Sequence, residues 1–204
     1  MTPGAYPGPA ARTLLAVALA LAACGGPSRP PRPPPVAATT RAWVEQAEEQ
    51  QQLRQYHRAR LLYLRAKREA PDDSSRGWAA MEYGRALLFW GEDKAARREL
   101  EQAVALRPGD ESAWHDLGMA AHRQHDPVAA ERAFRRSIAI NPDDPRSRLA
   151  LASLLVTLDR LDQAIAELQA VRELPVDADL RAKVDEGIAV LRKEQQLRGR
   201  APPP

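Results

Sequence analysis

The sequence predicts an all-α fold, a right-handed solenoid built from antiparallel helix pairs. Two stretches, 77–110 and 111–144, carry the same residue pattern at a spacing of 34 residues, as from Gly84 to Gly118. A fixed period of this length is typical of repeat proteins, in which each unit buries its apolar face against the next. Segments that alternate between apolar and polar residues, which would indicate strands, are missing from the sequence.

The recurring positions explain how two helices can pack closely. Small residues recur where the two helices of a pair would touch, a larger apolar residue fills the remaining gap, and a proline ends the second helix. The matching pairs are Gly84 and Gly118, Ala96 and Ala130, Leu100 and Phe134, and Pro108 and Pro142. This pattern resembles the tetratricopeptide repeat, and the resemblance implies a stack of helix pairs with one concave face.

The same pattern extends on both sides of these two repeats. We expect a degenerate repeat at 40–76, three clear repeats at 77–110, 111–144 and 145–178, a capping helix at 179–197, and a disordered tail at 198–204. The capping helix has one apolar face at helical spacing, formed by Leu180, Val184, Ile188 and Leu191. Gly91 falls in a turn that favours positive φ, and Asp159 replaces it in the last repeat.

The N-terminal segment reads as a targeting sequence. Residues 1–23 contain one basic residue, Arg12, before an apolar run that is too short to span a bilayer. The run ends in Leu21-Ala22-Ala23-Cys24, which resembles the lipobox of bacterial lipoproteins and implies lipidation of Cys24. Residues 24–39 then form a proline-rich tether. The alternative is an ordinary signal peptide that contains a cysteine.

The first helix of each pair is expected to line the concave groove, where the resemblance implies binding of a protein or peptide partner. The residues at the matching positions are Trp78, Met81, Arg85, Leu88, Phe89, His115, Met119, His122, Arg123 and Arg146. Methionine, aromatic and arginine side chains suit an adaptable protein interface. The alternative is that Trp78, Leu88 and Phe89 only pack against neighbouring repeats.

Other classes of function have weaker support. His115, His122 and His125 invite a metal site, but zinc sites usually contain a denser set of ligands. We therefore expect no metal, no cofactor and no enzymatic activity. The 30 basic and 27 acidic residues are interleaved along the helices, and export would remove the protein from nucleic acid, so we expect no nucleic-acid partner.

The sequence thus predicts a membrane-anchored scaffold of the bacterial cell envelope, held through Cys24 at the periplasmic face of the outer membrane. Its resemblance to bacterial tetratricopeptide lipoproteins implies a role in assembling an envelope complex such as the type IV pilus and secretin machinery. The alternatives are a regulator of cell-wall synthesis and a histidine-based metalloenzyme.

Overall fold

A computed structural model of the protein describes residues 36–199, and Cys24, the expected leader and most of the expected tether lie outside these residues. The described residues form two compact units, 36–141 and 142–199, and each is considered by itself. All regular secondary structure within 36–199 is helical, which confirms the predicted fold class. The helices are α2 (Ala38–Gln52), α3 (Tyr56–Glu69), α4 (Asp73–Phe89), α5 (Asp93–Leu106), α6 (Glu111–Arg123), α7 (Pro127–Ile140), α8 (Pro145–Thr157), α9 (Leu161–Arg172) and α10 (Ala178–Gly199).

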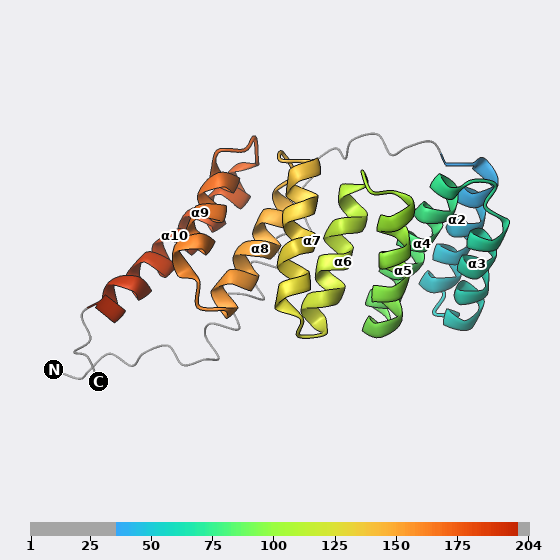
Figure 1. The fold of residues 1–204 in the computed structure, drawn as a ribbon, viewed down its shortest axis with the longest axis horizontal. Coiled ribbons are helices and arrows are strands. Elements are labelled where there is room, and N and C mark those ends of the chain that lie inside the picture. The colour runs from blue at the N-terminus through green and yellow to red at the C-terminus, as the bar shows by residue number, and fades with distance from the viewer. Residues whose placement is uncertain (1–35, 200–204) are drawn as a thin grey trace. The chain divides into compact units, whose positions relative to one another are not determined.

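Residues 36–141 form helix pairs that stack in chain order (Figure 1). Helix α2 pairs with α3, α4 with α5, and α6 with α7. The first helices also contact one another, α2 with α4 and α4 with α6, whereas the second helices make no comparable contacts within this unit. The first helices are therefore closer together, and they line the inner face of the unit.

Two glycines set the distance between the helices of a pair, as the sequence predicted. A Cβ atom built on Gly84 would lie 2.6 Å from Cγ of Leu100, and one built on Gly118 would lie 2.5 Å from Cε1 of Phe134. Both distances are far shorter than a normal contact between carbon atoms. Leu100 and Phe134 are fully buried, so neither side chain can move into solvent to make room.

The turn inside each helix pair contains one residue in the left-handed region. These residues are Arg54, Gly91, His125 and Asp159, with φ angles of 57°, 80°, 56° and 62°. The same backbone pattern closes each turn: in the third pair, the N–H of His125 donates to the carbonyl of His122 at 3.0 Å, and that of Asp126 to Ala121 at 3.0 Å. Two bonds of this kind form a Schellman motif, whose left-handed position favours glycine. His125 is therefore a turn residue at the position where the preceding repeat has Gly91.

We expect His125→Gly to stabilise the protein. A left-handed conformation costs a residue with a Cβ atom about 1–2 kcal/mol, and the greater freedom of glycine in the unfolded chain offsets part of the gain. The expected increase in the free energy of unfolding is about 0.5–1 kcal/mol, measured by urea denaturation. Gly91→Ala, in the equivalent turn, should have the opposite sign. A loss of stability in His125→Gly would show that the imidazole contributes more than the turn costs.

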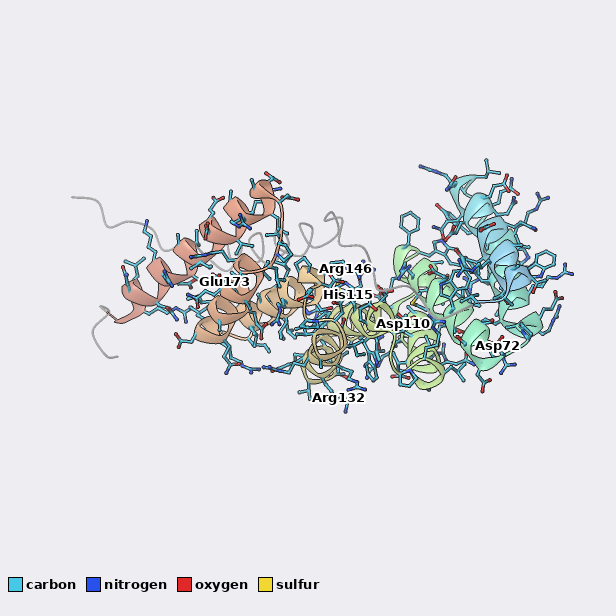
Figure 2. The ribbon with its side chains drawn as sticks, turned by 90° about the horizontal axis from the view of Figure 1, so that it is seen from above. Asp72, Asp110, His115, Arg132, Arg146 and Glu173 are labelled. Atoms are coloured by element: carbon cyan, nitrogen blue, oxygen red, sulfur yellow. The ribbon has the colours of Figure 1, made fainter. Side chains whose placement is uncertain are left out.

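Aspartate side chains begin several of the helices. Asp72 accepts a hydrogen bond from the backbone N–H of Ser75 at 2.7 Å at the start of α4. Asp110 accepts from the N–H groups of Ser112 and Ala113 at 3.1 and 3.2 Å at the start of α6. Figure 2 labels both aspartates. An N-cap of this kind contributes typically about 1 kcal/mol.

Asp110 has a second partner in the buried guanidinium of Arg107. The two side chains are 7% and 2% exposed, and Nη2 of Arg107 lies 2.7 Å from Oδ2 of Asp110. Arg107 also donates to the backbone oxygen and the hydroxyl of Ser74, at 3.3 and 3.1 Å. A Cβ atom on Gly77 would lie 2.9 Å from the Arg107 side chain. One guanidinium thus joins the first turn of α4 to the start of α6, and Gly77 leaves the space for it.

Three helix boundaries differ from the expected ones. Residues 74–76, at the end of the expected degenerate repeat, are instead the first turn of α4, because the cap at Asp72 starts the helix earlier. Helix α2 begins at Ala38, inside the expected tether. Helix α10 continues to Gly199, two residues into the expected tail, and residues 200–204 lie outside the described part of the chain.

The second unit contains α8, α9 and α10. Helix α9 contacts both α8 and α10. It ends at Arg172, ahead of Pro175. The four apolar residues predicted to form one face of α10 are all buried: Leu180, Val184, Ile188 and Leu191 are between 0% and 8% exposed.

Candidate functional site

The predicted groove residues at one end of α4 differ in exposure. Met81 and Leu88 are only 5% and 8% exposed and belong to the core of residues 36–141. Helix α4 contacts α2, α3, α5 and α6, so most of its surface is covered. Phe89, in the last turn, is 70% exposed. Phe89 therefore presents an apolar side chain to solvent, whereas Met81 and Leu88 mainly support the fold.

Trp78 and Met119 lie between these extremes. Both are partly buried and pack against the core of the same unit. The guanidinium of Arg41 on α2 lies 5.7 Å from the centre of the Trp78 ring, within the range of a cation–π contact. Both residues thus contribute to packing, and part of each side chain stays at the surface. This arrangement is compatible with both packing and partner binding.

Arg85 is held by carboxylates on its own helix and on the next inner helix. Its guanidinium lies 3.0 Å from Glu82 and 2.8 Å from Asp116 of α6. The Arg85 side chain is 44% exposed, while Glu82 and Asp116 are 11% and 13% exposed. Arg85 therefore links two repeats across the inner face, and its charge is already matched inside the protein.

On the inner face, a cleft of about 330 Å³ lies between α2 and α4. Its walls combine carboxylates, amides and apolar rings. The lining residues are Glu48, Gln51, Gln52, Tyr63, Glu82, Arg85, Ala86 and Phe89. The exposed ring of Phe89 thus stands at a cleft that contains two glutamates and one arginine.

The electrostatics of this cleft favour a positively charged partner. Burial raises the pKa of Glu48 and that of Glu82, despite the nearby Arg85. The carboxylate of Asp116 is the main cause that raises the pKa of Arg85, which is then charged at every ordinary pH. The cleft is lined by two carboxyl groups, Glu48 and Glu82, and by one guanidinium, Arg85, which is already paired with Glu82 and with Asp116. A cation from a partner would stabilise the ionised glutamates.

The comparison with known families agrees with this architecture. A model of the family described as tetratricopeptide repeat matches residues 121–184. The protein has the tetratricopeptide repeat fold. Residues 36–141 add stacked helix pairs of the same kind, with glycine at the helix crossing of α4 with α5 and of α6 with α7.

The curated relatives with matching sequence are much longer proteins. Superkiller complex protein 3 of Mus musculus is 26% identical over 117 residues, which cover 57% of this chain and 8% of that protein. Cellulose synthase operon protein C of Xanthomonas axonopodis pv. citri (strain 306) is 33% identical over 94 residues, which cover 46% of this chain and 6% of that protein. The chain thus spans less than a tenth of the length of these relatives.

Solved structures show the same fold at low sequence identity. The type III secretion chaperone SycD of Yersinia enterocolitica, in complex with a peptide of the translocator YopD, is 15% identical, with a TM-score of 0.54 over 57% of this chain and 92% of that chain. YrrB, described as a tetratricopeptide repeat protein with an unusual peptide-binding site, is 20% identical, with a TM-score of 0.60 over 76% of each chain.

The remaining predicted groove residues of α6 also have partners within the protein. Arg123 donates a hydrogen bond at 2.6 Å to the carbonyl of Leu88 in the last turn of α4. The ring of His115 lies 5.8 Å from that of Phe134. Burial lowers the pKa of His122, helped by His125 and Arg123, so His122 is neutral at pH 7. Arg123 and His115 thus contact neighbouring helices within the protein.

Arg146 belongs to the second unit. Its guanidinium lies 2.6 Å from Asp144, which caps α8 by accepting from the N–H of Arg146. Within residues 36–199, histidine, cysteine and acidic side chains form no group of three or more that could hold a metal ion. In the same residues, no helix combines the length and apolar character that crossing a membrane requires.

Sequence reasoning missed the acidic residues of the cleft. Glu48 lies in the degenerate first repeat, and Glu82 lies beside the recurring Tyr83 and Gly84. A signal for Glu82 existed, because the same face of the next inner helix carries Asp116, one repeat later. Glu48 had no such signal, since the first repeat differs from the others in this part of its pattern.

Proposed function

We propose that this protein is a tetratricopeptide repeat scaffold that binds a positively charged peptide segment of a partner protein. The binding surface is the inner face of residues 36–141, centred on the cleft between α2 and α4. Phe89 supplies an apolar contact for the peptide, and Glu48 and Glu82 attract its basic side chains.

The observation that carries this proposal is the exposed ring of Phe89 at the mouth of an acidic cleft. A phenylalanine that is 70% exposed on an inner helix leaves apolar area in water, which a partner would cover. The neighbouring carboxylates have raised pKa values because they are partly removed from water. The solved complex of SycD with a peptide and the peptide-binding site of YrrB support a peptide as the partner.

We further propose that the scaffold is anchored to the bacterial cell envelope through a lipid on Cys24. The lipobox-like sequence Leu21–Cys24 supports this proposal, as does the proline-rich segment that follows it. An anchored scaffold of this kind would assist the assembly of an envelope complex, for which the type IV pilus and secretin machinery is one candidate.

The peptide proposal predicts a charge preference that can be measured. Fluorescein-labelled peptides with one leucine flanked by lysines should bind the protein, and unlabelled matched peptides with aspartates should displace them at least about tenfold more weakly than unlabelled lysine peptides do, a difference of about 1.4 kcal/mol. Glu48→Gln/Phe89→Ala should weaken the lysine peptide by about tenfold or more, because it removes one attractive charge and the apolar contact. Fluorescence anisotropy measures both.

The matched control is Glu49→Gln/Val128→Ala. Val128 is 77% exposed, and neither residue lines the cleft, so this variant loses the same charge and a similar apolar group elsewhere. Binding of the lysine peptide should be unchanged in the control. Equal weakening in both variants would contradict the proposed face.

Binding should also weaken as the pH is lowered through the raised pKa values of Glu48 and Glu82, because protonation removes the attractive charge.

The anchor proposal is tested separately from peptide binding. In bacteria that process lipoproteins, the wild-type protein should incorporate a labelled fatty acid, and Cys24→Ser should not. Because residue 24 lies outside the repeats, both purified proteins should have the same thermal midpoint. Equal labelling of the two proteins would contradict lipidation at Cys24 and would leave peptide binding unaffected.

A further inference from the structure

A second cleft, of about 430 Å³, lies on the side of residues 36–141 formed by the second helices. Its floor is apolar and is formed by α6, and its walls come from α5 and α7. The lining residues are Arg97, Glu101, Val104, Trp114, Leu117, Ala121, Ala129, Arg132, Ala133 and Arg136. None of them lines the cleft between α2 and α4, so the two clefts are separate.

The second cleft exists because the third repeat has a small residue where its neighbours have a large one. Ala121 stands at the position that Leu87 occupies one repeat earlier and Leu155 one repeat later. Leu87 and Leu155 are both fully buried and fill the equivalent space. The smaller side chain of Ala121 leaves an apolar hollow on the α6 floor between α5 and α7, beside the ring of Trp114 on the same helix.

The rim of this cleft carries excess positive charge. Arg97 is paired with Glu101 of α5 and with Asp126 at the start of α7, both at 3.0 Å. Arg132 and Arg136 are exposed, and within residues 36–199 neither has a carboxylate at ion-pair distance. They lie four residues apart on α7 and thus share one helix face. Figure 2 shows Arg132 projecting from the edge of the unit.

We propose that this cleft is a second binding site, which takes an acidic peptide segment with one apolar anchor residue. The anchor side chain enters the hollow above Ala121 and beside Trp114. Carboxylates that flank the anchor pair with Arg132 and Arg136, whose planar guanidinium groups suit two-point contacts with carboxylates. This site goes beyond the proposed function, because its location and its charge preference are opposite to those of the inner face.

The apolar floor of the cleft favours a peptide over an extended anionic surface as the partner. An extended anionic surface, such as a membrane or a nucleic acid, would contact the exposed arginines but would leave the hollow empty. A single apolar side chain inside a small cleft, surrounded by a charged rim, is the usual arrangement of a peptide or protein hot spot. The size of the cleft, about 430 Å³, suits one large side chain and its neighbours.

The probe is a fluorescein-labelled peptide in which one phenylalanine is flanked on each side by two aspartates. A second peptide replaces the phenylalanine with glycine, and a third replaces the aspartates with lysines. The full-length protein should bind the first peptide at least about tenfold more tightly than the second, because only the first fills the hollow. Increasing the NaCl concentration should weaken binding of the first peptide, because salt screens the rim charges.

Two variants locate this binding. Ala121→Leu introduces the residue that the neighbouring repeats use at this position, so it fills the hollow at little risk to folding. Arg132→Ala/Arg136→Ala removes the rim charges. Each should weaken binding of the acidic phenylalanine peptide by about tenfold or more, while binding of the lysine–leucine peptide at the inner face stays unchanged. The indole N–H resonance of Trp114, assigned with Trp114→Phe, should shift on addition of the acidic peptide.

The control for non-specific attraction is Arg98→Ala/Arg192→Ala, which removes two exposed arginines outside the cleft. This control should bind the acidic peptide like the wild type. The proposal is overturned if Ala121→Leu binds as tightly as the wild type, or if the control weakens binding as much as the rim variant. Binding to anionic lipid vesicles or to RNA without binding to the acidic peptide would also overturn it. A failure of the inner-face proposal would remove only the comparison with the lysine–leucine peptide and would leave the outcomes for the acidic peptide unchanged.

Discussion

Gly118→Leu is expected to destabilise the protein strongly. The first atom of the new side chain would lie 2.5 Å from the ring of Phe134, which is 1% exposed and has no free space to enter. Overpacking of a core costs about 1–3 kcal/mol and sometimes more, and leucine adds further atoms beyond the Cβ. We expect a loss at or above the upper end of this range, measured by urea denaturation followed by circular dichroism.

Two further variants separate this clash from a general intolerance of change. Gly118→Ala/Phe134→Leu replaces the ring of Phe134 with a smaller leucine. This variant should be less destabilised than the sum of the two single variants, because leucine relieves the contact with the new Cβ atom at position 118. Gly109→Ala should have little effect or a small stabilising one, since a Cβ atom at Gly109 would meet nothing within 4 Å. A stable Gly118→Leu would show that α6 and α7 do not cross at this glycine.

Arg107→Met is expected to have the other large effect. It leaves the carboxylate of Asp110 buried without its ionic partner, and it removes the hydrogen bonds to Ser74 that join α4 to α6. Removing one partner of a buried ion pair costs about 3–5 kcal/mol, because the remaining charge loses its compensation. Methionine keeps much of the apolar part of the arginine side chain, so the measured loss of stability reports the removal of the guanidinium group.

A double variant tests this explanation. Asp110→Asn removes the charge but keeps an oxygen that can cap α6. Arg107→Met/Asp110→Asn should therefore be more stable than Arg107→Met alone. If the double variant were the less stable of the two, the cost of Arg107→Met would come from lost packing against Gly77 and not from an unpaired carboxylate.

The features that could be predicted from the sequence are those set by a recurring local rule. The glycines at the helix crossings, the positive φ at Gly91 and Asp159, and the apolar face of α10 follow from repeat spacing and backbone geometry. His125 stands at the same turn position, but its identity as a histidine suggested a metal ligand. Its positive φ shows that the backbone conformation of His125 is set by its position in the repeat and not by the chemistry of its side chain.

The features that could not be predicted depend on which side chains meet between repeats. Arg107 lies just before a helix-ending proline and resembles a surface residue in the sequence, yet it is 4% exposed because Gly77 leaves room for its side chain. Arg97 likewise resembles a surface residue in the sequence, but it reaches Asp126 of the next pair. Partners of this kind are fixed by the packing of one repeat on the next, which the repeat pattern alone does not specify.

The charge of the inner face is a further case. The sequence pointed to arginine, methionine and aromatic residues in the groove, but Arg85 is paired within the protein and Met81 is buried. The carboxylates of Glu48 and Glu82 thus determine the charge of the cleft, and the expected partner becomes a basic peptide.

The free energy of unfolding should fall as the pH rises from the ordinary carboxyl pKa of 4.5 to the raised pKa values of Glu48 and Glu82, because the folded state binds these protons more tightly than the unfolded state.

The central claim is that the inner face between α2 and α4 binds a basic peptide. The most direct measurement is cross-linking mass spectrometry with a lysine-rich peptide whose single apolar residue carries a diazirine. We expect cross-links on the last two turns of α2 and the last turn of α4, around Phe89. These cross-links should be lost in Glu48→Gln/Phe89→Ala. Cross-links that fall mainly on α5 and α7, or that persist unchanged in this variant, would contradict it.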